Sequence, residues 1–510
     1  MRVKVNTSQL EIDKLRKQIA SLQQKILIKD DKIASQHEKI KSLSSILDQY
    51  KKHRFGSKSE AIHPGQGTLF NEPEASIEDQ KTNAEIQVSG YKKKKSRKKT
   101  LSDSLPREKN VIDVSPEDKL CSCGCEMKKV GEDLSEKVEV IPRQIKIVQN
   151  IRPKYSCPKC KGKFAQSPAP KSIIPKSFSS ESLLAHIITA KYVDGLPLYR
   201  QETIWTRAGI DLSRATMAHW VIKVAKELMP LANLIKEHTF AWKVVHLDET
   251  VVQVLKEKDR KPTSKSYAWV AARNDNKPSV YFEYHSSRSG KIASQLLDEY
   301  SGYVVTDGYA GYNSAMTNKY EFHCGCWDHC RREFFKAFKA VKEEPSSLAA
   351  YALHYIRILY GVERREKQSS AQRRYRARQL YSRGVLDHLY KWMIRNIDKV
   401  PKSSDTGKAL HYMFNQWHKL INYLKDGNIP LSNERAENAI RPFVVGRKAW
   451  LFSDTPAGAD ASMCLYSIIE TCKANGHEPF AYLSQILRQI PHCSSLEDYE
   501  TLLPWNFPVK

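Results

Sequence analysis

The feature that most constrains the fold is a set of Val- and Tyr-rich runs between residues 241 and 335. Four runs have the composition of strands, WKVVHLDETVVQVL, SYAWVAAR, SVYFEYH and GYVVTDGYAGY, and a helix-like piece, KIASQLLDEY, precedes the last. Short runs of β-branched and aromatic residues are typical of strands. The predicted order is therefore strand, strand, strand, helix, strand, which indicates an α/β domain.

This order of elements is that of a ribonuclease-H-like core, which we expect to span residues 241–470. Residues 336–425 return to a helical pattern rich in Lys and Arg. A loop, DGNIPLSN, then leads into ERAENAIRPF, where Ser432 or Asn433 is expected to cap a helix. Residues 471–510 form a C-terminal segment.

Acidic residues stand where this core would expose them. Asp248 follows the apolar run VVHL and Asp307 follows YVVT, and α/β folds place reactive groups at strand ends. The third candidate is Glu437 in LSNERAENAIRPF, with Glu434 one helical turn earlier as the alternative. The competing interpretations are turn aspartates at the two strand ends and a helix-capping acid.

Three carboxylates that converge repel one another unless cations neutralise them. Two Mg²⁺ ions about 3.5–4 Å apart, or Mn²⁺ in their place, meet that need and suit phosphodiester chemistry. One ion lowers the pKa of a water or a 3′-hydroxyl, and the other stabilises the leaving oxygen. Arg435 and Arg441 flank the acidic pair and are expected to hold DNA phosphates.

The charge of the chain points to a polyanionic partner. Lys and Arg total 83 against 57 Asp and Glu, a net charge of +26, and nucleic acid is the commonest such partner. A membrane is the other candidate, but no stretch approaches the ~20 apolar residues that span a bilayer. The N-terminus lacks the apolar core of a signal peptide. The expected location is the cytoplasm.

Residues 56–110 have the composition of a basic flexible linker, in which residues 92–99 read KKKKSRKK. Charges this dense are typical of an extended, solvated segment, and they also suit non-specific phosphate contacts. The predicted DNA contacts are Lys92, Lys93, Lys94, Lys95, Arg97, Lys98 and Lys99.

The first 55 residues carry a heptad repeat that predicts a coiled coil. The a positions are Ile12, Ile19, Ile26, Ile33, Ile40 and Leu47, and the d positions are Leu15, Leu22, Lys29, Gln36, Leu43 and Tyr50. Ile at a with Leu at d favours a parallel dimer, although a higher oligomer is also consistent. The alternative is a long helix packed on its own chain.

Residues 111–165 indicate a small zinc-binding β module. Its cysteines are Cys121, Cys123, Cys125, Cys157 and Cys160. Cys157-x-x-Cys160 has the spacing of a zinc knuckle, and two of the other three thiols would complete one structural Zn²⁺ site. The spacing does not decide which two. Unligated reduced cysteines are the alternative.

Residues 166–240 are predicted to be helical. A break at Gly209 separates two helical patterns, and Ser213 is placed to cap the second. The pair is similar to a helix-turn-helix that binds DNA, although other helix pairs share the pattern.

Taken together, the motifs resemble the transposases of the insertion sequence 66 family. The resemblance rests on HRFGSKSE after the coil, the cysteine block CSCGC…CPKC, HLDET, TDGYAGY, GCWDHCRREF, NERAENAIRP and the C-terminal PFAYLSQILRQIPHCSS. It implies a DDE triad of Asp248, Asp307 and Glu437, and a ribonuclease-H fold with residues 336–425 as a helical insertion. The chain departs from the family at Ser432, where Asp is frequent, and in its extra cysteine.

Within GCWDHCRREF the family motif presents Cys326, His329 and Arg332. Arg332 is a further expected DNA contact. Cys326-x-x-His329 also resembles half of a second zinc site, with His323, Cys324 and Cys330 nearby. We favour a buried strand-to-helix junction, with His329 hydrogen-bonded near the active site, because no second ligand pair is visible.

The predicted function is that of a DNA transposase. It would bind the terminal inverted repeats of its element and catalyse metal-dependent strand cleavage and transfer into target DNA, with or without accessory proteins of the same element. The alternatives are a non-catalytic DNA-binding regulator and a structure-specific nuclease of the same fold.

Overall fold

The computed structural model describes residues 29, 36–37, 40, 145–156, 164–316 and 322–508. Contacts divide the chain into two compact units, Ser57–Pro168 and Met1–Gly56 with Ala169–Lys510. The basic tract and the five cysteines of the predicted zinc module lie outside the described residues. So does most of the predicted coiled coil, of which Lys29, Gln36, His37 and Ile40 are described as helical and exposed.

The described part of the smaller unit is a short hairpin. β1 (Lys154–Ser156) pairs antiparallel with β2 (Phe164–Gln166), and Tyr155 lies opposite Ala165. In sequence, the two strands flank the Cys-x-x-Cys motif. Residues 145–153, which precede β1, form neither helix nor strand.

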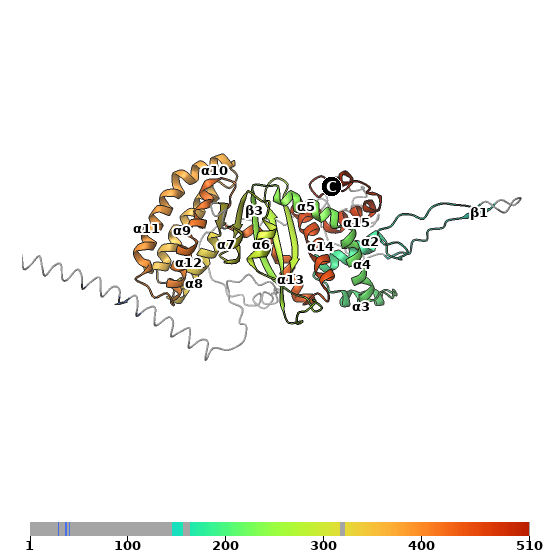
Figure 1. Cartoon of the computed structure of the whole chain (residues 1–510), viewed down its shortest axis with the longest axis horizontal. Helices are drawn as coiled ribbons and strands as arrows, with labels where there is room; N and C mark the ends of the chain where they lie inside the picture. Colours follow the sequence, from blue (N-terminus) through green and yellow to red (C-terminus); the bar gives the residue numbers. More distant parts are fainter. Residues whose placement is uncertain are drawn as a thin grey trace, which may run out of the picture. The chain divides into compact units, whose positions relative to one another are not determined.

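The larger unit contains a five-stranded mixed sheet in the order β5-β4-β3-β6-β7, as far as the described residues go (Figure 1). The first three strands in sequence pair antiparallel, whereas β3, β6 and β7 run parallel. All four predicted strands are present; β7 was not predicted, because it is only three residues long. The strands are β3 (Val244–Gln253), β4 (Lys265–Arg273), β5 (Ser279–His285), β6 (Tyr303–Thr306) and β7 (His323–Gly325).

The predicted helical region before the sheet is confirmed as a series of helices. Gly209, with a φ of +78°, ends the helix before it in a left-handed conformation that favours glycine. The hydroxyl of Ser213 accepts from the backbone N–H of Thr216, as the capping prediction requires. The helices are α2 (Glu181–Tyr192), α3 (Leu198–Arg207), α4 (Arg214–Glu227) and α5 (Met229–Phe240).

Between β7 and the helix that carries Glu437, the chain is helical, as the composition of residues 336–425 predicted. These helices bury their own apolar core, which joins the sheet through Val244, Val305 and Cys324. The elements are α8 (Trp327–Ala340), α9 (Leu348–Arg365), α10 (Ala371–Ala377), η5 (Arg378–Ser382), α11 (Arg383–Ile397), α12 (Asp405–Leu420) and η6 (Asn422–Lys425).

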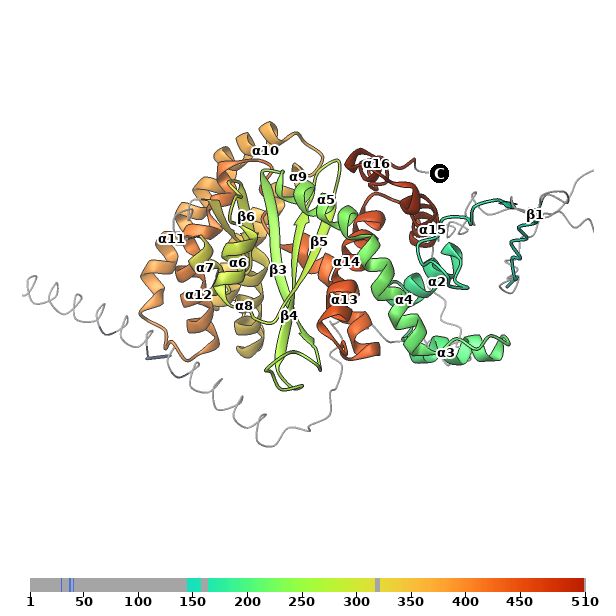
Figure 2. The ribbon, with the colours of Figure 1, turned by 45° about the vertical axis from the view of Figure 1, so that its right-hand side comes forward.

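The remaining helices complete the layers. The helices between β7 and Glu437 lie on one side of the sheet and the C-terminal helices on the other (Figures 1 and 2). None of the described helices is long and apolar enough to cross a bilayer. The remaining elements are α6 (Gly290–Leu296), α7 (Gly311–Ala315), α13 (Glu434–Trp450), α14 (Pro456–Ala474), α15 (Pro479–Gln489), η7 (Ile490–His492) and α16 (Leu496–Thr501).

Helix α14 closes the free edge of β5 with two hydroxyl groups. Thr471 Oγ1 accepts from the backbone N–H of Val280 at 3.0 Å, and Ser467 Oγ accepts from Phe282 at 2.8 Å. An open strand edge invites pairing with another chain, and buried N–H groups need acceptors. These side chains therefore anchor α14 to the sheet and satisfy its edge.

We expect Thr471→Val to destabilise the protein by about 1–3 kcal/mol, because the buried N–H of Val280 loses its acceptor while side-chain volume is kept. Thr189→Val is the matched control, since the buried hydroxyl of Thr189 has no hydrogen-bond partner in the described structure. The measurement is the urea unfolding midpoint of both variants. Equal midpoints would show that the edge bond contributes nothing.

Candidate active site

The structure places the two predicted aspartates on neighbouring parallel strands. Asp307 directly follows β6, as predicted. The prediction that Asp248 ends its strand is wrong, because β3 continues to Gln253 and Asp248 lies opposite Val270 of β4. The parallel pairing of β3 with β6 nevertheless ends at His246, so Asp248 lies just beyond the parallel part of the sheet. Both aspartates therefore stand at its carboxyl end.

Glu437 reaches this region from the first turn of α13, and Asn433 fixes that turn against the sheet. The fully buried side chain of Asn433 donates from Nδ2 to the carbonyl of Leu247 at 2.8 Å. Its Oδ1 lies 3.1 Å from Nδ1 of His246, and its backbone N–H donates to Sγ of Cys326 at 3.2 Å. Asn433 occupies the N-cap position, but its side chain does not cap the helix as predicted. The side-chain hydrogen bonds of Asn433 are made to β3 instead.

The pKa of Asp248 is affected by the charges of both other candidate acids. Burial raises the pKa of Asp248 to about 8, with further increases from the negative charges of Glu249, Asp307 and Glu437. The backbone N–H of Glu249 opposes the shift by donating to Asp248 Oδ1 at 2.8 Å. Among the described residues, neither Asp248 nor Asp307 forms an ion pair with a basic side chain.

Glu437 differs from the aspartates because it has a basic partner. Nη2 of Arg332, on α8, lies 2.7 and 2.9 Å from its two carboxylate oxygens. Burial opposes the charge of Arg332, but Glu437 outweighs it and raises the pKa of the guanidinium. The predicted DNA contact Arg332 therefore pairs with an acid of the site in this structure.

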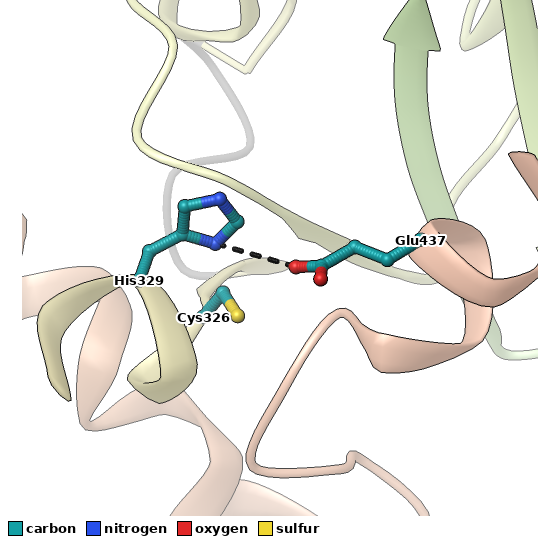
Figure 3. Close-up of side chains that lie close together, drawn as sticks. All are labelled: Cys326, His329 and Glu437. Atoms are coloured by element: carbon teal, nitrogen blue, oxygen red, sulfur yellow. Dashed lines mark ion pairs between the residues drawn. The ribbon is translucent and has the colours of Figure 1, made fainter. Parts of the chain in front are cut away.

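Two further side chains approach Glu437 from the start of α8. Nδ1 of His329 lies 3.6 Å from Oε1 of Glu437, and the sulfur of Cys326 faces the same gap (Figure 3). The predicted strand-to-helix junction is present, since β7 ends at Gly325 and α8 begins at Trp327. The hydrogen bond expected for His329 is not found at Nδ1, which is buried without a partner in the described structure.

The other residues predicted near this motif lie apart from that gap. The sulfurs of Cys324 and Cys330 are buried, and Nε2 of His323 lies 2.7 Å from the hydroxyl of Thr306. The gap is lined by Cys326, His329 and Glu437, the one group of potential metal-binding donors found together among the described residues.

The charged residues that flank Glu437 on α13 differ in their exposure to solvent. Glu434 is exposed and accepts from Asn438 at 3.3 Å, so Glu437 is the acid that faces Asp248. Arg441 is exposed and available to a phosphate. Arg435 is half-buried, and burial lowers its pKa while the charge of Glu470 opposes that effect. Its Nε and Nη2 have no hydrogen-bond partner in the described structure.

A second buried acid beside the site was not predicted. Glu249 follows Asp248 in the strand and therefore points to the opposite face of the sheet. Burial raises its pKa, although hydrogen bonds from Tyr312 and Arg288 counteract the shift. Arg288 Nε donates to Glu249 at 2.6 Å. The consecutive acids in LDET were the available signal, but sequence alone did not show that Glu249 is buried.

The loop after Asp307 is held by α12. A Cβ at Gly308 would lie 2.7 Å from the ring of Tyr412, so a larger residue there would require the Tyr412 side chain to shift. Nζ of the buried Lys419 donates to Asn313 at 2.6 Å. Burial lowers the pKa of Lys419 to about 8, and the charge of Asp307 opposes the shift. Neither contact was predicted, because they join segments about a hundred residues apart.

Comparison with known proteins identifies the class to which this sheet and acidic site belong. Residues 176–461 match the transposase IS66 family, and residues 467–505 match the IS66 C-terminal element. Residues 118–161 match the zinc-finger binding domain of transposase IS66, and residues 42–109 match the family described as transposase C of IS166 homeodomain. The matches are those of a transposase. The chain belongs to the IS66 transposase family.

Relatives of similar length support this assignment. The uncharacterized protein y4qI of Sinorhizobium fredii is 31% identical over 492 residues, which cover 93% of this chain and 90% of the relative. The uncharacterized protein y4hP of the same organism is 30% identical and covers 82% of this chain and 78% of its own. The similarity therefore extends over several domains rather than one motif.

The raised pKa of Asp248 predicts how stability depends on pH without metal. Between pH 4 and 8, the folded state keeps the Asp248 proton that the unfolded state releases, so its contribution to stability falls as pH rises and levels off above about 8. In EDTA, Asp248→Asn should raise the thermal midpoint, and by more at pH 8 than at pH 5.

Asp275→Asn is the control of opposite sign. Burial opposes the ionisation of Asp275, but hydrogen bonds and charge from Arg273 prevail and lower its pKa. The ionised Asp275 therefore stabilises the folded state above its unfolded pKa, and its replacement should lower the thermal midpoint at pH 8. A pH-independent effect of Asp248→Asn would contradict the assigned shift.

Proposed function

We propose that this chain is a DNA transposase that binds the terminal inverted repeats of its element and then cuts and joins strands with Asp248, Asp307 and Glu437. The observation that carries the proposal is that burial raises the pKa of Asp248 and that the charges of Glu249, Asp307 and Glu437 raise it further. Acids from β3, from the end of β6 and from α13 thus face one another.

The sheet supports the fold that this function needs. The order β5-β4-β3-β6-β7, with three antiparallel strands followed by two parallel ones, fits a ribonuclease-H-like core. In this assignment residues 336–425 are the helical insertion, because they separate β7 from the helix that carries Glu437.

The donor set fits two Mg²⁺ or Mn²⁺ ions. Carboxylate oxygens are the ligands that Mg²⁺ prefers, and bound cations would offset both the burial and the neighbouring negative charges that raise the pKa of Asp248. When bound, the ions activate a water or 3′-hydroxyl and stabilise the leaving oxygen. Asn433 holds the first turn of α13 so that Glu437 faces the aspartates, and Arg332 balances its charge.

We expect Asp248→Ala, Asp307→Ala and Glu437→Gln each to lower the rate of DNA strand cleavage in Mg²⁺ by on the order of 100-fold or more. Loss of residues that only orient ligands already costs 10–100-fold in comparable sites. Glu434→Gln is the matched control, because this exposed acid lies one turn away on the same helix. Near-normal cleavage by any triad variant would remove that residue from the site.

The same substrates separate the competing functions. A transposase joins the cleaved 3′ end to target DNA, whereas a structure-specific nuclease stops after cleavage. A DNA-binding regulator binds the ends and cleaves neither strand. Labelled inverted-repeat DNA with a supercoiled target therefore gives a different product for each function.

The parts outside the described residues have proposed roles in DNA binding and assembly. Residues 92–99 supply salt-sensitive phosphate contacts, and exposed Arg441 adds one beside the catalytic helix. Residues 1–55 mediate dimers or higher oligomers through the heptad seam. Accessory proteins of the same element and association with the nucleoid belong to this proposal.

We expect Cys157→Ser with Cys160→Ser to remove one zinc ion per chain, because these residues and two of Cys121, Cys123 and Cys125 form one structural site. The matched family region, residues 118–161, contains all five cysteines. Selectivity for transposon ends should fall as the module unfolds, while non-specific binding persists. Metal analysis and end binding in competitor DNA measure both, and Cys493→Ser is the control. Unchanged zinc content would exclude these ligands.

A further inference from the structure

Cys326, His329 and Glu437 bring together a donor set that differs from the rest of the active site. Each offers one ligand atom, and these atoms all lie within 4.8 Å of one another. Figure 3 shows the imidazole and the carboxylate pointing toward each other, with the sulfur beside them. A Mg²⁺ site built from carboxylates uses neither sulfur nor nitrogen. The Cys and His of this gap are therefore not explained by the proposed catalysis.

The distances suit a small tetrahedral ion. With Zn–N and Zn–O bonds of about 2.0–2.1 Å, the nitrogen and oxygen ligands of a tetrahedral site lie about 3.3 Å apart. Nδ1 of His329 and Oε1 of Glu437 are 3.6 Å apart, which is too long for a hydrogen bond and close to that spacing. Nδ1 is also buried and lacks a hydrogen-bond partner in the described structure. A metal ion would satisfy that lone pair.

The backbone already holds the ligands in place. Cys326 is the N-cap of α8 and His329 lies in its first turn, so the two side chains are one helical turn apart. The backbone N–H of Asn433 donates to the sulfur of Cys326 and fixes its position. Because Asn433 immediately precedes α13, the same residue positions Glu437.

We propose that Cys326, His329 and Glu437 bind one Zn²⁺, or a similar thiophilic divalent ion, and that this ion inhibits the enzyme by withdrawing Glu437 from the aspartates. Binding transfers the thiol proton of Cys326 to solvent, and the ion replaces Arg332 as the counter-charge of Glu437. A water completes the tetrahedron. The inhibitory part rests on the proposed function, whereas the zinc site itself does not.

The binding test uses the full-length protein and counts zinc at equilibrium. Wild type should hold one ion more than Cys326→Ser and one more than His329→Gln, in addition to any zinc held near residues 118–161. Cys464→Ala is the matched control, because Cys464 is also buried but lies on α14 and should leave the count unchanged. Circular dichroism verifies that each variant is folded. Equal zinc content in wild type and both site variants overturns the proposal.

The inhibition test measures strand cleavage in constant Mg²⁺ while Zn²⁺ is increased. Each variant is normalised to its own rate without zinc, and Cys326→Ser should need at least ~10-fold more zinc for half-inhibition than wild type or Cys464→Ala. Identical sensitivity overturns the inhibitory role. If wild type binds the additional zinc but cleaves no DNA under any condition, the proposed transposase function fails while the zinc site stands.

Discussion

The buried side chain of Asn433 is the contact on which the geometry of the site depends. It joins β3 through Leu247 and His246, and its backbone joins the start of α8 through Cys326. Because Nδ2 donates to a carbonyl, Oδ1 is left as an acceptor, and His246 must carry its proton on Nδ1. Burial lowers the pKa of His246 to about 4, which keeps the ring neutral. One amide therefore sets where α13 begins and where Glu437 points.

Burying a carboxylate beside the sheet is unfavourable, and the two faces of β3 differ in which groups surround the buried acid. Glu249 faces the side where Arg288 and the hydroxyl of Tyr312 reach its carboxylate, so its charge is satisfied within the protein. Asp248 faces the other side, where its charged neighbours are acids. A fold selected only for stability would pair or remove such a group. The two consecutive acids therefore differ in whether a basic side chain of the protein supplies a counter-charge.

Local patterns predicted much of this arrangement. Strands β3 to β6 were evident from Val- and Tyr-rich runs, and Ser213 was recognisable as a cap. Three-residue β7 was too short to produce a periodic signal. The sequence analysis ended β3 too early because Asp248 and Glu249 interrupt an apolar run, although both residues pair with β4. The partners of Glu437 were also beyond prediction, since Arg332 lies 105 residues away in sequence and meets it only in the fold.

The helices between β7 and α13 contribute side chains to the candidate site. They supply Arg332 to Glu437, and α12 brings the end of the Tyr412 side chain against Gly308 in the loop after Asp307. Lys419 of the same helix is buried beside that loop and bonded to Asn313. A buried ammonium is costly unless it is paired, and burial lowers the pKa of Lys419 while the charge of Asp307 opposes that shift. The loop of Asp307 and the first turn of α13 are thus both contacted by side chains from these helices.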